Sequence, residues 1–309
     1  MSPRVIGTAC GISAAILFAG KAVLVRLAYS HGSGATDLLA WRMAWSLPCF
    51  ALIAAWYAHR DGSVARGDRI RLVLLGVLGY HVASWLDFSG LRFIDAALER
   101  VVLFIYPTVV VGLALLRGKR GLDRNVFLAL AATYGGILLT WGDRIETANA
   151  VGVLLVAASA VAFAVHLVLI EDVVKRVGST RAMAIAMIGA ATTSGLHALL
   201  MEPQATLHPS TATLAFGAAL ALFATVIPVL LAAVALVRLG AARAAVLGTV
   251  APALTALLGW TVLNEHLGAL GWCGITVTMI GALLISRPPR SRASPTVTEP
   301  LHTRCSMTS

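Results

Sequence analysis

The amino-acid sequence predicts an all-α membrane protein with ten transmembrane helices, arranged as two inverted five-helix repeats. Three observations predict this fold class. Of the 309 residues, 59% are apolar and 12% are charged, whereas a soluble domain is about 25% charged. The apolar residues fall in blocks of roughly 20, the length that crosses about 30 Å of hydrocarbon. Several polar and proline positions also recur at one fixed offset along the chain.

Ten apolar segments follow one another, and the short links between most of them predict antiparallel neighbours. They are Val5–Tyr29, Leu38–Ala58, Leu72–Phe93, Ala97–Leu116, Val126–Trp141, Val151–Ile170, Met183–Met201, Thr213–Leu236, Ala244–Leu263 and Leu267–Ser286. The first segment contains Lys21 and lacks a clean cleavage site, so we expect a retained helix and not a signal peptide. The polar, proline-rich chain after Ser286 predicts a disordered cytoplasmic tail.

Basic residues set the predicted orientation. With the amino terminus in the cytoplasm, most of the 24 lysines and arginines fall in inner segments, as the positive-inside rule requires. The sequence therefore predicts a multi-pass protein of the inner or plasma membrane with both termini cytoplasmic. Topology accounts for the net charge of +10, and basic residues spread over short loops give no support for a nucleic-acid partner. The four scattered cysteines predict neither a disulfide framework nor a metal site, and we expect no cofactor.

A proline lies inside two of the apolar segments. Pro107 interrupts the fourth segment and Pro252 the ninth. A membrane helix tolerates proline because neighbouring groups satisfy the backbone carbonyl that loses its partner. That carbonyl lies four residues earlier, at Leu103 and Gly248. The two prolines either expose these carbonyls to substrate or water, or bend the helices for packing, and the sequence favours neither.

The repeat has an offset of 145 residues (252 − 107). The same offset relates Phe18-Ala-Gly-Lys21 to Phe163-Ala-Val-His166, and Gly136-Ile-Leu-Leu139 to Gly281-Ala-Leu-Leu284. We therefore expect repeats at residues 1–143 and 144–288, followed by a tail at 289–309. Five helices per repeat is an odd number, so the two halves have opposite orientations. Inverted repeats of this kind are typical of secondary transporters, whose substrate site lies at the repeat interface.

Ionisable residues inside membrane segments are candidates for function because they are costly in lipid. Lys21 lies about 6 Å outside the midplane at 1.5 Å per residue. Lys21 either pairs with Asp87 as a gating contact or binds an anionic group of the substrate. The simpler alternative is that its long side chain places the ammonium at the membrane–water interface. His166 lies at a similar depth on the cytoplasmic side, where it has a function or hydrogen-bonds to a neighbouring helix.

Tyr80, Ser84 and Asp87 form a polar stripe on one face of the third segment, with spacing i, i+4, i+7. The predicted substrate-binding or gating set comprises Lys21, Tyr80, Ser84, Asp87, Pro107, His166 and Pro252. Three further residues, Arg42, Glu99 and Arg100, lie nearer the outer surface. They line an outer vestibule or, as the position favours, form an interfacial belt of charge.

Two motifs resemble a known family. Glu99-Arg-Val-Val-Leu-Phe-Ile-Tyr-Pro-Thr108 is similar to the ten-helix, EamA-type branch of the drug/metabolite transporter superfamily. So is Leu239-Gly-Ala-Ala-Arg-Ala-Ala-Val-Leu-Gly-Thr-Val-Ala-Pro252, together with Leu258-Gly-Trp-Thr-Val-Leu-Asn-Glu265. The resemblance covers about Ile6 to Ser286. The family usually ends both segments with glycine-glutamate, but here the fourth ends with Gly118-Lys119. The resemblance implies a carrier of small metabolites such as amino acids, often an exporter.

The sequence therefore predicts a secondary transporter that works by alternating access, with a small-molecule substrate and the lipid bilayer as partners. A membrane channel is an alternative, since inverted repeats do not exclude one. A membrane-embedded enzyme is the other alternative, although the chain has no HExxH, GxxxxGK[ST] or GxSxG motif. The sequence leaves open which ion or counter-substrate drives transport and whether two copies form a homodimer.

Overall fold

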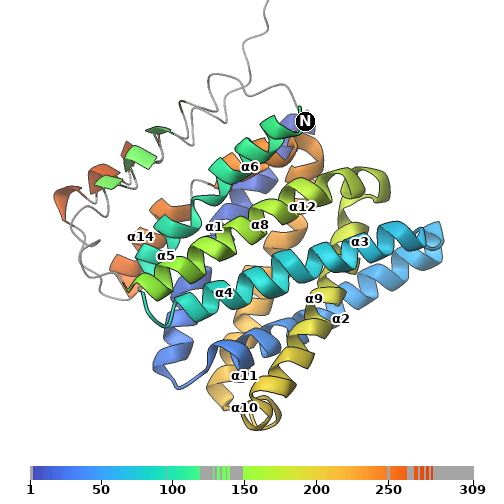
Figure 1. The fold of residues 1–309 in the computed structure, drawn as a ribbon, viewed down its shortest axis with the longest axis horizontal. Coiled ribbons are helices and arrows are strands. Elements are labelled where there is room, and N and C mark those ends of the chain that lie inside the picture. The colour runs from blue at the N-terminus through green and yellow to red at the C-terminus, as the bar shows by residue number, and fades with distance from the viewer. Residues whose placement is uncertain are drawn as a thin grey trace, which may run out of the picture.

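The computed structural model describes most of the chain up to residue 262 (Figure 1). The described residues are 3–94, 96–118, 128, 131–132, 134–136, 138–139, 149–248, 251–262, 268–270, 272–274, 276–277 and 280. Within them every regular element is a helix and no strand occurs, so the predicted all-α class is confirmed for this part of the chain.

The named helices include two short π-helical stretches. In chain order they are α1 (Pro3–Ser30), α2 (Ala35–Asp61), α3 (Arg66–Gly76), the π-helix η1 (Val77–Val82), α4 (Ala83–Gly90), α5 (Ala96–Leu103), α6 (Tyr106–Leu116), α8 (Ala150–Val177), α9 (Ser179–Met201), α10 (Pro203–Leu207), α11 (Thr211–Ala221), the π-helix η3 (Leu222–Val226), α12 (Ile227–Leu239), α13 (Ala241–Leu247) and α14 (Ala251–Val262).

Six helices in the described ranges are long and apolar enough to cross a membrane. They are Pro3–Ser30, Ala35–Asp61, Arg66–Gly90, Ala150–Val177, Ser179–Met201 and Thr211–Leu239, and they match the first, second, third, sixth, seventh and eighth predicted segments. Most of the fifth and tenth predicted segments lies outside the described residues. The total of ten helices therefore stays a prediction.

The fourth predicted segment is not one continuous helix, so that expectation is wrong. A turn at Phe104 and Ile105 separates α5 from α6, and Pro107 lies within the first two positions of α6. Proline fits there because the first helical residues have no intrahelical partner for their N–H groups. The hydroxyl of Tyr134 donates to the carbonyl of Phe104 over 2.9 Å and so satisfies part of the turn. The ninth segment is described as α13 and α14, on either side of residues 249–250.

The two π-helices begin at repeat-equivalent positions. Val77 starts η1 in the third segment, and Leu222 starts η3 in the eighth, 145 residues later. Single π-turns inside α-helices often mark functional sites. The backbone irregularity therefore follows the same offset as the sequence.

The packing between helices is reciprocal. The α1 helix packs against α12, as α8 packs against α4, and α9 contacts α3 while α2 contacts α11. In each case the offset of 145 exchanges the two helices of one pair for those of the other. Reciprocal contacts of this kind indicate a two-fold relation between the two halves.

Two glycines show this relation at the level of single atoms. A Cβ atom at Gly7 would lie 2.9 Å from Cβ of Arg238, and one at Gly152 would lie 2.8 Å from Cβ of Phe93. The offset of 145 converts the first pair into the second. Glycine at both positions lets the backbones approach closely, which is how membrane helices associate where lipid supplies little hydrophobic driving force.

Candidate functional site

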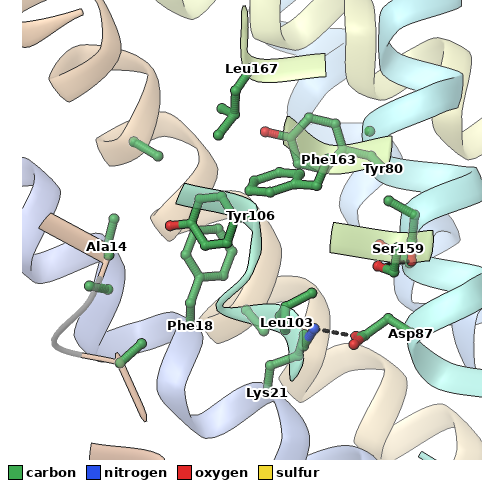
Figure 2. A pocket seen from close by; sticks show the side chains of 18 of the residues that line it. Ala14, Phe18, Lys21, Tyr80, Asp87, Leu103, Tyr106, Ser159, Phe163 and Leu167 are labelled. Carbon is green, nitrogen blue, oxygen red and sulfur yellow. Dashed lines mark hydrogen bonds and ion pairs between the residues drawn. The ribbon is translucent and has the colours of Figure 1, made fainter. Parts of the chain in front are cut away.

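A cavity of about 160 Å³ lies between the two halves of the chain (Figure 2). Its wall is formed by α1, α2, η1, α4, α5 and α6 on one side, and by α8, η3, α12, α13 and α14 on the other. Many lining residues come in pairs that are 145 residues apart, so equivalent positions of the two repeats line the same cavity. These pairs are Ala14 and Ser159, Phe18 and Phe163, Gly79 and Ala224, Asp87 and Ala232, Leu103 and Gly248, and Tyr106 and Ala251.

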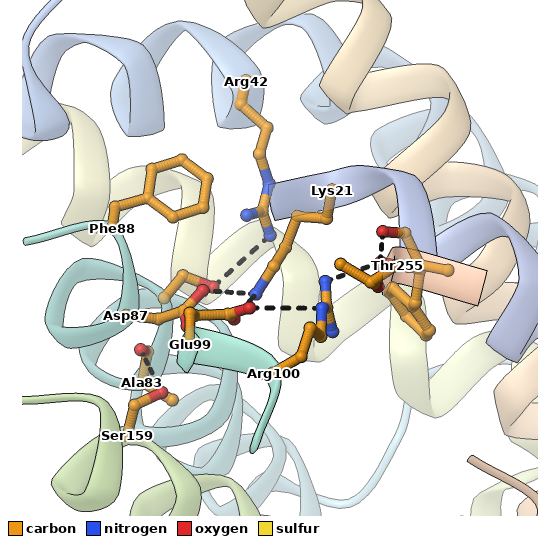
Figure 3. Close-up of polar contacts among 12 residues, drawn as sticks. Lys21, Arg42, Ala83, Asp87, Phe88, Glu99, Arg100, Ser159 and Thr255 are labelled. Atoms are coloured by element: carbon orange, nitrogen blue, oxygen red, sulfur yellow. Dashed lines mark hydrogen bonds and ion pairs between the residues drawn. The ribbon is translucent and has the colours of Figure 1, made fainter. Parts of the chain in front are cut away.

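A cluster of buried charges, drawn in Figure 3, lies at the end of the cavity where Lys21 and Asp87 line it. The ammonium of Lys21 contacts Asp87 directly and lies 3.5 Å from Oε1 of Glu99. Arg100 completes the cluster, because its Nε lies 3.2 Å from Oε2 of Glu99 and its Nη2 donates to the carbonyl of Phe18 over 2.7 Å. Asp87 is 1% exposed and Glu99 is fully buried. Two cations and two carboxylates thus compensate one another.

A third cation, Arg42, lies at the same end of the cavity, and no carboxylate of the described residues lies within ion-pair distance of it. Its Nε donates to Oγ1 of Thr225 over 2.9 Å, and its Nη2 lies 3.4 Å from Oγ of Ser84. The guanidinium carbon lies 5.3 Å from the ring centre of Phe88, within range of a cation–π interaction. Arg42 is 3% exposed, and its buried Nη1 has no hydrogen-bond partner in the part of the chain that the structure describes.

Aromatic rings form the middle of the cavity. Phe18, Tyr80, Tyr106 and Phe163 project between Leu167 at one end and Lys21 at the other (Figure 2). The rings of Tyr106 and Phe163 meet edge to face, with their centres 5.4 Å apart. The site thus combines a charged end with an apolar, aromatic body.

His166 lies behind this wall. It is fully buried, and its ring contacts those of Tyr80 and Phe163, with centres 5.0 and 5.9 Å away. Its Nδ1 lies 2.6 Å from the carbonyl of Leu75. A carbonyl only accepts, so Nδ1 carries a proton and donates. A Cβ atom at Gly79 would overlap the imidazole, so glycine in η1 makes room for this histidine.

The structure brings most of the predicted residues together. Lys21, Tyr80, Ser84 and Asp87 all line the cavity, whereas His166 contacts its lining from behind. Arg42, Glu99 and Arg100 are each at least 96% buried, so they do not form an exposed belt of charge. Glu99 and Arg100 pair with each other, and Glu99 also lies beside Lys21, so their charges are compensated inside the bundle. A role in an outer vestibule stays a prediction for all three.

The prolines lie beside the cavity. Pro107 is buried in α6 next to the lining residue Tyr106. Pro252 falls within α14, but its side chain lies outside the described residues. The two residues whose carbonyls we expected to be released, Leu103 and Gly248, both line the cavity.

Sequence reasoning found Tyr80 but missed Thr225, Ser159 and the other three aromatic residues of the cavity, which are Phe18, Tyr106 and Phe163. Thr225 and Ser159 are buried, and Ser159 donates to the carbonyl of Ala83 over 2.6 Å. Part of the signal was available, because Phe18 and Phe163 belong to the repeated motif that contains Lys21 and His166. The offset also places Thr225 at the position equivalent to Tyr80.

Comparisons with known proteins agree with this architecture. The model of the EamA-like transporter family matches the chain twice, at residues 5–142 and 150–287. The chain is 30% identical over 274 residues to the "Uncharacterized transporter YcbK" of Bacillus subtilis (strain 168). The aligned region covers 86% of this chain and 85% of the relative.

A protein of known crystal structure has the same fold. It superposes with a TM-score of 0.70 at 19% identity, over 90% of this chain and 95% of the other. The two family matches start 145 residues apart, so the chain contains two copies of the family repeat. The protein is therefore a multi-pass membrane protein with two repeats, and it belongs to the EamA-like transporter family.

Proposed function

We propose that the protein is a secondary transporter that carries a small metabolite across the cell membrane by alternating access, with the cavity as its substrate site. The observation that carries this proposal is the position of the cavity. It lies between the two repeats and is lined by equivalent residues of both. Substrate sites of inverted-repeat transporters lie at this interface.

The alternating-access step follows from the same symmetry. The two halves have opposite orientations in the membrane. When each half adopts the conformation that the other had, the cavity that was open to one side of the membrane becomes open to the other side. The cluster around Lys21 and Asp87 lies at one end of the cavity, and we propose that it opens and closes as a gate. The family resemblance favours export, with amino acids or related metabolites as cargo.

The orientation that we propose places ten helices in the membrane and both termini in the cytoplasm. Its support is the concentration of basic residues in the inner segments. A carboxy-terminal reporter that is active only outside the cytoplasm should stay silent, and robust activity of that reporter would refute the arrangement.

Transport itself is tested in two steps. An unbiased comparison of metabolites in cells with and without the protein identifies candidate cargo. Purified protein in liposomes should then move this cargo with saturable kinetics that counter-substrate stimulates. Flux that rises without saturation would instead identify a channel, and chemical turnover of the cargo by purified protein would identify an enzyme.

A further inference from the structure

We propose that Arg42 binds the carboxylate of the cargo and that the cavity therefore selects small organic anions with an apolar body. This inference rests on the proposed function and names the class of substrate for the same cavity. Both the charge of the cavity and the geometry around Arg42 lead to it.

Three cations but only two carboxylates gather at this end of the cavity, and Arg42 is the cation that has no carboxylate beside it among the described residues. Five ionisable groups gather at this end of the cavity, namely Lys21, Arg42, Asp87, Glu99 and Arg100. Each carboxylate lies within 4 Å of Lys21, Arg100 or both, whereas no carboxylate oxygen of the described residues lies that close to Arg42. A buried charge is costly unless it is paired. One carboxylate from the cargo would supply the missing partner.

The hydrogen bonds around Arg42 hold it in position for such a partner. The hydroxyl of Thr225 donates its single proton to the carbonyl of Leu220 over 3.0 Å. Its oxygen is then left to accept from Nε of Arg42 over 2.9 Å. This arrangement fixes one edge of the guanidinium against η3. It leaves Nη1 buried, with no hydrogen-bond partner among the described residues, on a side chain that lines the cavity.

Lys21 is the less suitable anion site, although the sequence makes it a candidate. Asp87 and Glu99 already lie beside its ammonium, so an added carboxylate would meet two like charges. The contacts that orient Arg42 among the described residues are uncharged: they are the hydroxyls of Thr225 and Ser84 and the ring of Phe88. An arginine also offers a planar fork that matches a carboxylate.

The remainder of the cavity sets the shape of the cargo. Its volume of about 160 Å³ is close to that of an engineered apolar cavity that binds benzene. The rings of Phe18, Tyr80, Tyr106 and Phe163 surround this space. Benzoate, which joins one ring to one carboxylate, is therefore a suitable probe.

The test measures binding of benzoate to the purified full-length protein, with benzamide and benzylamine as neutral and cationic probes of similar shape. Hydrogen bonds to a charged group predict that benzoate binds about tenfold to hundredfold more tightly than benzamide, and that benzylamine binds least. Arg42→Gln should abolish this preference, and Arg42→Lys should retain part of it. Arg26→Gln is the matched control, because Arg26 contacts the carbonyl of Leu91 and does not line the cavity.

A stability measurement separates binding from a structural role. Removing an unpaired buried cation should leave the ligand-free protein equally stable or more stable. Equal binding of benzoate and benzamide, absence of benzoate binding, or an Arg42→Gln variant that keeps the preference would each overturn the inference. Failure of the transport proposal would look different, since benzoate would bind through Arg42 while liposomes showed no saturable flux.

Discussion

Lys21 and His166 occupy equivalent positions in the two repeats but have opposite surroundings. Lys21 lies between two carboxylates at the charged end of the cavity. His166 lies among aromatic rings and donates to a backbone carbonyl behind the cavity wall. The helices that hold them pack reciprocally, as the matched glycines Gly7 and Gly152 show. The two repeats therefore share a backbone and differ in where they place charge.

The same contrast holds at the neighbouring positions. In the second repeat, the positions equivalent to Arg42, Asp87 and Glu99 are uncharged. They are Met187, Ala232 and Ala244, each 145 residues further along the chain. Among the described residues that line the cavity, the charged side chains all come from the first repeat, although both repeats contribute to the lining. A symmetric scaffold gives two related conformations, and an asymmetric set of charges gives one end of the cavity its own chemistry. Each prediction below compares equivalent positions of the two repeats.

The largest effect is expected from removing the charge of Lys21. Lys21→Met leaves Asp87 as a buried carboxylate without its direct partner, which costs about 3–5 kcal/mol. His166→Met leaves only the carbonyl of Leu75 without a donor, which costs about 1–3 kcal/mol. Thermal unfolding of the purified variants compares the two. Adding Asp87→Asn should restore much of the stability lost in Lys21→Met, and equal losses at positions 21 and 166 would contradict the asymmetry.

The two π-helices differ at the equivalent positions Gly79 and Ala224, and mutation of Gly79 tests why glycine is needed in only one of them. Gly79→Ala places a methyl group inside the ring of His166, so we expect the upper end of the 1–3 kcal/mol (about 3) that overpacking costs. His166→Ala in the same chain should relieve most of this loss, because it removes the ring. A double-mutant cycle with no coupling energy would show that the close contact is not what requires glycine.

Gly7 and Gly152 test the reciprocal packing. Gly7→Ala introduces a Cβ within 3.0 Å of α12, and Gly152→Ala introduces one within 3.0 Å of the turn that follows α4. Each should cost about 1 kcal/mol or slightly more. Gly20→Ala is the matched control, since no atom of the described residues lies within 4 Å of a Cβ there, and it should be neutral or stabilising. Losses of very different size at Gly7 and Gly152 would break the two-fold relation.

The prolines are expected to affect stability least. Pro107→Ala and Pro252→Ala restore a backbone N–H near the start of a helix, where it is not needed, so stability should change by less than about 1 kcal/mol. If the two prolines shape the cavity, both variants should lower transport more than they lower expression. Wild-type transport by both would reduce the prolines to packing features.

Much of the fold could be predicted because apolar blocks and a repeat offset are properties of the sequence itself. The stripe of Tyr80, Ser84 and Asp87 was likewise found from helical spacing, and all three residues line the cavity. The break before Pro107 and the burial of Arg42 could not be predicted. Both depend on what lies opposite, which for Arg42 is Thr225, 183 residues further along the chain.

The central claim is that cargo passes through the cavity between the repeats, and modification of Ser159 tests it most directly. Ser159→Cys would be made in a chain whose native cysteines, Cys10, Cys49, Cys273 and Cys305, are replaced by serine. Because Ser159 lines the cavity, a thiol reagent should abolish transport in liposomes, and saturating cargo should slow the modification. Full transport after complete modification of this cysteine would contradict the claim.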